Sequence, residues 1–118
     1  MNGLPTNINL NELIGAELLQ ICIGGFQCIL NFDKDINLSI ECECIYDSGE
    51  GEKLLITDYT QNAALLCNLI DKNISHAARS DDGGLLIRFS NHVVLHLLNN
   101  NGHYESFQVN IKGQTFVA

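Results

Sequence analysis

The sequence matches itself at a nearly constant offset, and this internal near-repeat limits what the chain can fold into. The segment "LIGAELLQICIG" (13–24) aligns with "LIDKNISHAARS" (69–80) at an offset of 56 residues. The segment "CILNFDKDINLSI" (28–40) aligns with "LLIRFSNHVVLHL" (85–97) at an offset of 57, one residue having been inserted at an Asp-Asp-Gly-Gly turn. Few residues are identical, so chance similarity between strand-forming segments is the alternative. The shared order of segments favours a true repeat.

The residue pattern of each half predicts a short helical turn followed by three strands. Apolar and polar residues alternate in the second and third of these strands, as they do in strands with one buried face. The inward positions are Cys28, Leu30, Phe32, Ile36, Leu38, Ile40, Cys42 and Cys44 in the first half, and Leu85, Ile87, Phe89, Val93, Leu95 and Leu97 in the second. The half-repeats span about 13–46 and 69–111.

The segment between the halves predicts a helical connection at about 58–70. Its run of Ala, Leu and Cys suits two to three helical turns, and Asp58 or Thr60 could cap the start. The segment "NELIG" is the shorter counterpart in the first half, with Asn11 as its cap and Gly15 as its end. An Asn101-Gly102 turn is expected to lead into a strand with Phe107, Val109 and Ile111 inward, and a last short strand, "QTFVA", follows.

These patterns predict a mainly β fold with a minor α component. We expect one domain over residues 1–118, with about seven or eight strands and one or two short helices. Two antiparallel β-meander half-repeats would pack as a sandwich or a partly open barrel, since both arrangements bury the alternating faces.

Charge and composition narrow the class of function. The net charge of −8 disfavours direct binding to nucleic acid and to anionic membranes, and it favours a basic partner. Acidity that only keeps the protein soluble is the alternative. The N-terminus lacks the basic and apolar regions of a signal peptide, and no apolar run approaches the ~20 residues of a membrane helix. Five irregularly spaced cysteines indicate a reducing cytoplasm, with the cysteines as small buried residues.

Two motifs resemble metal sites but favour structural roles. Cys42 and Cys44 lie two residues apart, so on one strand both would face the core, while Glu41 and Glu43 would face solvent. The "HVVLH" motif (92–96) would bind a metal on a helix, but on a strand its histidines lie ~13 Å apart. His76 and His103 stand alone. We therefore expect no metal, no cofactor and no catalytic set, and predict that the protein is not an enzyme.

Carboxylates are concentrated in one stretch of the chain. Residues 41–52 carry five of them with no Lys or Arg among them. A solvated acidic face is the ordinary interpretation, but a docking site for a basic protein is the alternative that carries a function. The candidate partner-binding residues are Glu41, Glu43, Asp47, Glu50 and Glu52, with Asp33 and Asp35 as extensions.

Several segments together resemble a family of small bacterial β-rich domains of unknown function. The resemblance rests on "LIGAELLQICI", "LNFDKDINLSIE", "LIDKNISHA", "LLIRFSNHVVLHL" and "HYESFQVN", and it covers most of the chain. Leu13-Ile14-Gly15, Leu30-Asn31-Phe32 and Tyr104-Glu105-Ser106-Phe107 fit the motifs of that family. Asp71 replaces the second glycine of the pattern, so we expect the second helical turn to end differently.

Such proteins resemble immunity proteins of bacterial toxin–immunity systems, including contact-dependent growth inhibition. The resemblance implies a cytoplasmic protein that binds a cognate toxin, commonly a basic nuclease domain, and neutralises it by stoichiometric occlusion. It carries over no contact residues. The alternative is a non-catalytic ligand-binding or structural β-domain that forms a homodimer through an exposed strand edge; an enzyme comes third.

Overall fold

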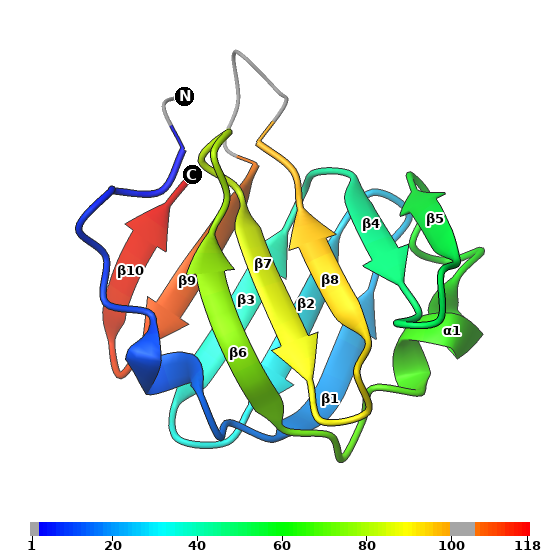
Figure 1. Ribbon diagram of the computed structural model, residues 1–118, viewed down its shortest axis with the longest axis horizontal. Coiled ribbons are helices and arrows are strands. Elements are labelled where there is room, and N and C mark those ends of the chain that lie inside the picture. The colour runs from blue at the N-terminus through cyan, green and yellow to red at the C-terminus, as the bar shows by residue number, and fades with distance from the viewer. Residues whose placement is uncertain (1–2, 100–105) are drawn as a thin grey trace.

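The computed structural model describes residues 3–99 and 106–118, and within them the chain forms ten strands in two antiparallel sheets (Figure 1). The first sheet contains, in spatial order, β1 (Leu18–Ile23), β2 (Cys28–Phe32), β3 (Ile36–Ile40), β9 (Phe107–Ile111) and β10 (Gln114–Val117). The second contains β5 (Lys53–Ile56), β4 (Cys44–Asp47), β8 (Val94–Leu97), β7 (Leu85–Phe89) and β6 (Ile74–Arg79). The sheets pack face to face, so the predicted sandwich is confirmed, and the described strands close no barrel.

The two halves of the chain exchange strands between the sheets. The meander β1-β2-β3 lies in the first sheet, but the hairpin β4-β5 that follows it lies in the second. The meander β6-β7-β8 lies in the second sheet, and its following hairpin β9-β10 lies in the first. Antiparallel ladders β3–β9 and β4–β8 therefore join one half to the other within each sheet.

The two meanders have the same strand pairing, including a shift of register at equivalent positions. Leu18 pairs with Phe32, and the register of β1 against β2 then shifts before Gln20. Ile74 pairs with Phe89, and the register of β6 against β7 shifts at the equivalent point. Phe32 and Phe89 stack on each other inside the sandwich, with ring centroids 6.4 Å apart. These equivalent positions of the two halves therefore meet inside the core. A duplication as the origin of this correspondence stays a prediction.

Reciprocal hydrogen bonds join the halves where β1 and β6 begin. The Leu18 N–H donates to the Lys72 carbonyl at 3.0 Å, and the Ile74 N–H donates to the Ala16 carbonyl at 2.8 Å. Each residue of the first bond is 56 positions from its counterpart in the second. The chain thus has a local two-fold relation at the junction of its halves.

The helical turn of the second half ends as the first does, which corrects the expectation drawn from Asp71. Gly15 has a φ of 91° and Asp71 has a φ of 73°. Aspartate tolerates this left-handed conformation better than most residues that have a side chain. The missing glycine therefore changes the residue but leaves the backbone path unchanged.

The helices are shorter than predicted and are capped by other residues. η1 (Asn11–Leu13) is a 3₁₀-helix whose N-cap is Leu10, and α1 (Ala63–Cys67) has Asn62 as its N-cap. The Asp58 carboxylate instead accepts hydrogen bonds from the preceding turn, including one from the Thr60 N–H at 2.9 Å. η1 packs on β6, and α1 packs on β1 beside the β5 edge (Figure 1).

The predicted third strand of the first half was too long. It was expected to run from Ile36 through Cys44, but β3 ends at Ile40, and the chain then crosses to the other sheet. Alternation continues through the crossover because Cys42 and Cys44 are both buried. This split, together with β5, accounts for the higher number of strands. The predicted Asn101-Gly102 turn, His103 and the Tyr104-Glu105 motif lie outside the described residues.

Candidate protein-binding surface

The structure distributes the seven predicted acidic residues over three places. Asp33 and Asp35 lie in the β2–β3 turn, where the Asp33 carboxylate accepts a hydrogen bond from the Glu17 N–H at 2.9 Å. Glu41 lies just beyond the opposite end of β3, where its N–H donates to the Ser106 carbonyl. The whole length of β3 therefore separates the two predicted extensions from Glu41.

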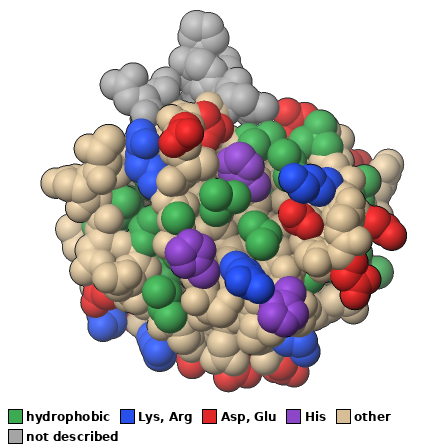
Figure 2. All heavy atoms as spheres, viewed as in Figure 1, with side chains coloured by type: hydrophobic (Ala, Val, Ile, Leu, Met, Phe, Trp, Pro, Cys, Tyr) green, Lys and Arg blue, Asp and Glu red, His purple; other side chains and the backbone are tan. Residues whose placement is uncertain are grey.

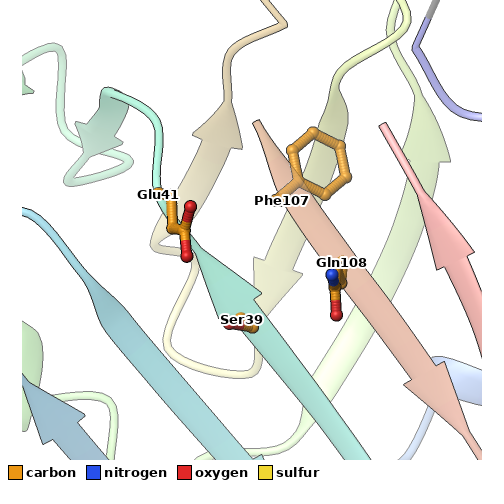
Figure 3. Close-up of a pocket in the computed structure, with 4 residues that line it drawn as sticks. All are labelled: Ser39, Glu41, Phe107 and Gln108. Carbon is orange, nitrogen blue, oxygen red and sulfur yellow. The ribbon is translucent and has the colours of Figure 1, made fainter. Parts of the chain in front are cut away.

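Glu41 and Glu43 belong to the crossover between the sheets. Glu41 is exposed and Glu43 is half-buried. A hollow of about 20 Å³ is lined by Ser39, Glu41, Phe107 and Gln108 (Figure 3). Such a volume holds about one water molecule, so this hollow is too small for a substrate or a peptide side chain.

Asp47, Glu50 and Glu52 are brought together in the turn of the β4–β5 hairpin. Asp47 Oδ1 accepts a hydrogen bond from the Gly49 N–H at 2.9 Å, and the Ser48 N–H donates to the Glu52 carbonyl at 3.0 Å. Both Glu50 and Glu52 are exposed. This hairpin turn is the place where three predicted carboxylates share one short, exposed segment.

An apolar hollow adjoins this acidic turn. Its volume is about 290 Å³, and its lining includes Tyr46, Leu54 and Leu65 together with Ser48, Glu52 and Lys53. Leu65 comes from α1, whereas the other residues come from the β4–β5 hairpin. No pattern in the sequence predicts this hollow, because it forms between segments that no shared periodicity connects.

β5 forms one edge of the second sheet and exposes consecutive leucines. The exposed fractions of Leu54 and Leu55 are 44% and 51%. At the equivalent edge of the first sheet, β10 carries Phe116 and Val117 at these positions, and both are half-buried. The fold therefore does not require the exposure at β5, because the same strand position elsewhere in the molecule is better covered.

A further exposed aromatic residue lies in the β1–β2 turn, near the end of β5. The exposed fraction of Phe26 is 83%, the largest among the exposed large hydrophobic residues in the described segments. The Tyr59 N–H, three residues beyond β5, donates to the Gly25 carbonyl of this turn at 3.2 Å. We name Asp47, Glu50, Glu52, Leu54 and Leu55 the hairpin edge; Phe26 lies beyond its far end.

The cysteines divide into a buried and an exposed group. Cys42 and Cys44 are buried, as predicted, and the Tyr59 hydroxyl donates to the Cys42 carbonyl at 2.6 Å. Burial raises the pKa of Cys42 to about 12 and that of Cys44 to about 11. Cys22 and Cys67 are exposed, which corrects the expectation that the cysteines as a group serve as buried residues.

The outer face of the second sheet combines histidine with apolar side chains (Figure 2). On this face Ile45, His96 and Leu86 lie in one row across β4, β8 and β7. In the turn between β7 and β8, His92 Nδ1 accepts a hydrogen bond from Arg88 Nη2 at 2.8 Å. Among the described residues, no group of three or more His, Cys, Asp or Glu side chains is placed to hold a metal ion.

Ser80, Asp82 and His96 form a cluster that resembles a hydrolase triad in composition only. His96 Nε2 lies 3.2 Å from Ser80 Oγ and 3.8 Å from Asp82 Oδ1. The Ser80 hydroxyl also donates to Asp82 Oδ1. In a catalytic triad, serine and aspartate contact different ring nitrogens of the histidine, whereas here both face the same one. The cluster instead organises the β6–β7 turn.

Asp82 is held ionised by its place in that turn. Burial tends to raise the pKa of its carboxyl, but hydrogen bonds from Ser80 and from the backbone N–H groups of Gly84 and Asn99 outweigh this. Its pKa therefore lies below the ordinary value for aspartate. This explains the Asp-Asp-Gly-Gly insertion as a structural turn.

A family model described as "Family of unknown function (DUF6188)" matches residues 10–118. The chain belongs to the DUF6188 family. This confirms the predicted resemblance to a domain family of unknown function. No curated protein and no solved structure matches the DUF6188 chain. Within residues 3–99 and 106–118, no helix has the length and apolar character needed to cross a membrane.

Proposed function

We propose that this protein is an immunity protein that binds a cognate bacterial toxin, a basic domain, and neutralises it by stoichiometric occlusion. The observation that supports the proposal most is the hairpin edge. There, the carboxylates of Asp47, Glu50 and Glu52 adjoin an apolar hollow and two exposed leucines. An apolar centre with a charged rim is the usual composition of a protein–protein interface.

Electrostatics suits a basic partner at this edge. Three carboxylates stand against one ammonium group, that of Lys53, in the hairpin, and the whole chain has a net charge of −8. Carboxylates at the rim mainly raise the association rate, whereas buried apolar contacts mainly slow dissociation. Such a protein would act in the cytoplasm, where it would cover the nucleic-acid-binding surface of the toxin.

Co-expression with the product of the adjacent upstream gene tests this function. We expect the two proteins to co-purify as a complex and the immunity protein to restore growth of cells that make the toxin. Cells that die in spite of the co-expressed protein would contradict the proposal for that pair. The test requires a neighbouring gene whose product is toxic, so the growth of cells that express this product alone is measured first.

Charge reversal at the hairpin edge tests where the toxin binds. The double variant Glu50→Lys, Glu52→Lys should slow association at low salt by about tenfold or more, because electrostatic steering changes association rates by 10–1,000-fold. The double variant Glu12→Lys, Asp81→Lys is the matched control, since it makes the same change in net charge at exposed positions that are not candidate partner-binding residues. Equal slowing in both variants would show that only net charge matters.

A further inference from the structure

The outer side of β5 has backbone groups available for pairing. The Ser48 N–H donates to the Glu52 carbonyl, and in an antiparallel ladder every second pair exchanges such bonds. Tyr46 with Leu54, and Cys44 with Ile56, are therefore the hydrogen-bonded pairs of this ladder. It follows that the N–H and C=O groups of Lys53 and Leu55 point away from β4, to the open side of the sheet.

No described segment covers these groups. β5 is the last strand of its sheet, and within residues 3–99 and 106–118 no backbone hydrogen bond joins Lys53 or Leu55 to a segment on the open side. An uncovered edge strand with apolar side chains is a template for a further strand. Leu54 borders the apolar hollow on one side of β5, and Leu55 lies on the outer face of the sheet on the other.

Charge distinguishes between the possible occupants of this edge. A second copy of the chain would bring its own Asp47, Glu50 and Glu52 toward an edge that is already acidic. An extended basic segment would instead bring cations to the hairpin-turn end of β5, where these carboxylates lie, and its small apolar residues would pack against Leu54 and the hollow.

We propose that the hairpin edge binds its partner by β-augmentation: an extended, basic segment of the partner adds to β5 as the sixth strand of the second sheet. This inference rests on the proposed function and names the kind of segment that the toxin supplies. Main-chain hydrogen bonds to Lys53 and Leu55 give the pairing, and the neighbouring carboxylates select basic side chains.

A synthetic peptide, Lys-Val-Lys-Val-Lys-Val-Lys, is the probe, and Glu-Val-Glu-Val-Glu-Val-Glu is its control. We expect the basic peptide to shift the backbone amide resonances of Lys53 and Leu55 in isotope-labelled protein and to slow the hydrogen exchange of both amides. The acidic peptide should leave them unchanged. Shifts centred on another strand, or equal shifts with both peptides, would overturn the inference.

Proline substitution tests the contribution of a backbone hydrogen bond to binding separately from that of the carboxylate side chains. Leu55→Pro removes an N–H that β4 does not use, and proline is tolerated on edge strands at such positions. We expect it to weaken binding of the basic peptide by about tenfold or more, since the ladder to the added strand loses a donor. Val117→Pro is the matched control, because Val117 occupies the equivalent position on the β10 edge.

A second variant protects the test against loss of folding in Leu55→Pro. Leu55→Lys keeps the backbone intact and should weaken binding of the basic peptide while it strengthens binding of the acidic one. If neither variant alters peptide binding, β-augmentation is wrong. A dimer in sedimentation that Leu55→Pro dissociates would also overturn it, because the occupant would then be a second copy.

The inference and the proposed function fail in different ways. If Leu55→Pro binds the toxin as tightly as the wild type while Glu50→Lys, Glu52→Lys does not, β-augmentation is overturned and the immunity function stands. If the basic peptide pairs with β5 but the wild-type protein fails to rescue growth, the immunity function is rejected and the strand-binding edge stands.

Discussion

The outer faces of the two sheets carry different types of side chain at equivalent positions. One row of the first sheet consists of Gln20, Asn31, Asn37, Asn110 and Thr115, and the equivalent row of the second consists of His76, Arg88, Val94, Asp47 and Lys53. The first row is uncharged and bonded internally: Asn110 Nδ2 donates to Asn37 Oδ1 at 2.7 Å and Asn31 Nδ2 to Gln20 Oε1 at 3.0 Å. The second row is charged and partly apolar.

The difference shows which positions the fold constrains. The inward positions of the inner strands β2, β3 and β9 and of β4, β7 and β8 are apolar, because the sandwich buries them. The outward positions are free to differ, and the apolar and charged residues have collected on the second sheet and at its β5 edge. An amide row that satisfies its own hydrogen bonds gains little from a partner, whereas exposed leucines and carboxylates gain more.

The largest expected effect contrasts buried with exposed thiols. Burial raises the pKa of Cys28 to about 12, so only about one thiol in 10,000 is ionised at pH 8. Native protein treated with iodoacetamide at pH 8 should therefore be alkylated at Cys22 and Cys67, while Cys28, Cys42 and Cys44 react only after unfolding. Peptide mass spectrometry measures this. Rapid alkylation of Cys28 in folded protein would contradict the described core.

The next effect tests whether the two halves contribute equally to the core. Phe32→Ala and Phe89→Ala should each lower the free energy of unfolding by about 3–5 kcal/mol, since each leaves a cavity inside the sandwich. Urea titration measures both. Phe89 is fully buried and Phe32 is 6% exposed, so we expect the loss to be somewhat larger for Phe89. A large loss in one variant only would break the equivalence of the halves.

A smaller effect concerns the two ends of the helical turns. Gly15→Ala should lower the free energy of unfolding by about 1–2 kcal/mol, because a φ of 91° strains any residue with a side chain. Asp71→Gly should change it by less than about 1 kcal/mol, since relief of strain opposes the added freedom of the unfolded chain. Thermal unfolding compares the two. A large loss in Asp71→Gly would reveal a role for the carboxylate beyond conformation.

The smallest effect tests the turn that carries the inserted residue. The pKa of Asp82 is lower in the folded protein than in the unfolded chain, so the ionised carboxylate stabilises the fold. This stabilisation is fully present above the pKa of the unfolded chain. It is lost as the pH falls through the pKa of the folded protein. Asp82→Asn should cost on the order of 1 kcal/mol or less at pH 7, because solvent screens an exposed side chain. The difference from wild type should shrink near pH 3. A difference that grows there would contradict the lowered pKa.

Sequence patterns predicted the interior better than the surface. Strict alternation in β2, β3, β7 and β8 assigned their inward faces correctly, because one buried face imposes that period. The same alternation concealed the crossover at Cys42, since the residue stays buried after β3 has ended. β5 has no buried face along most of its length, so it gave no periodic signal.

The candidate surface was predicted only in part. The carboxylates of the hairpin turn were named from their density in the sequence, but that density also included Glu41, which the crossover carries elsewhere. The apolar hollow depends on α1 lying against the β4–β5 hairpin, a contact between segments that meet only in the folded chain. The identity of the exposed edge likewise depends on the order of strands in the sheet.

The exchange of hairpins also constrains how the protein is made. The first sheet lacks β9 and β10 until all five strands of the second sheet have been synthesised, although its other three strands precede the second sheet in the chain. The β3 edge of the meander β1-β2-β3 therefore has no partner strand while the second sheet is being synthesised. Both sheets therefore depend on contacts between residues distant in sequence, and folds of this kind form more slowly than helical folds of similar size.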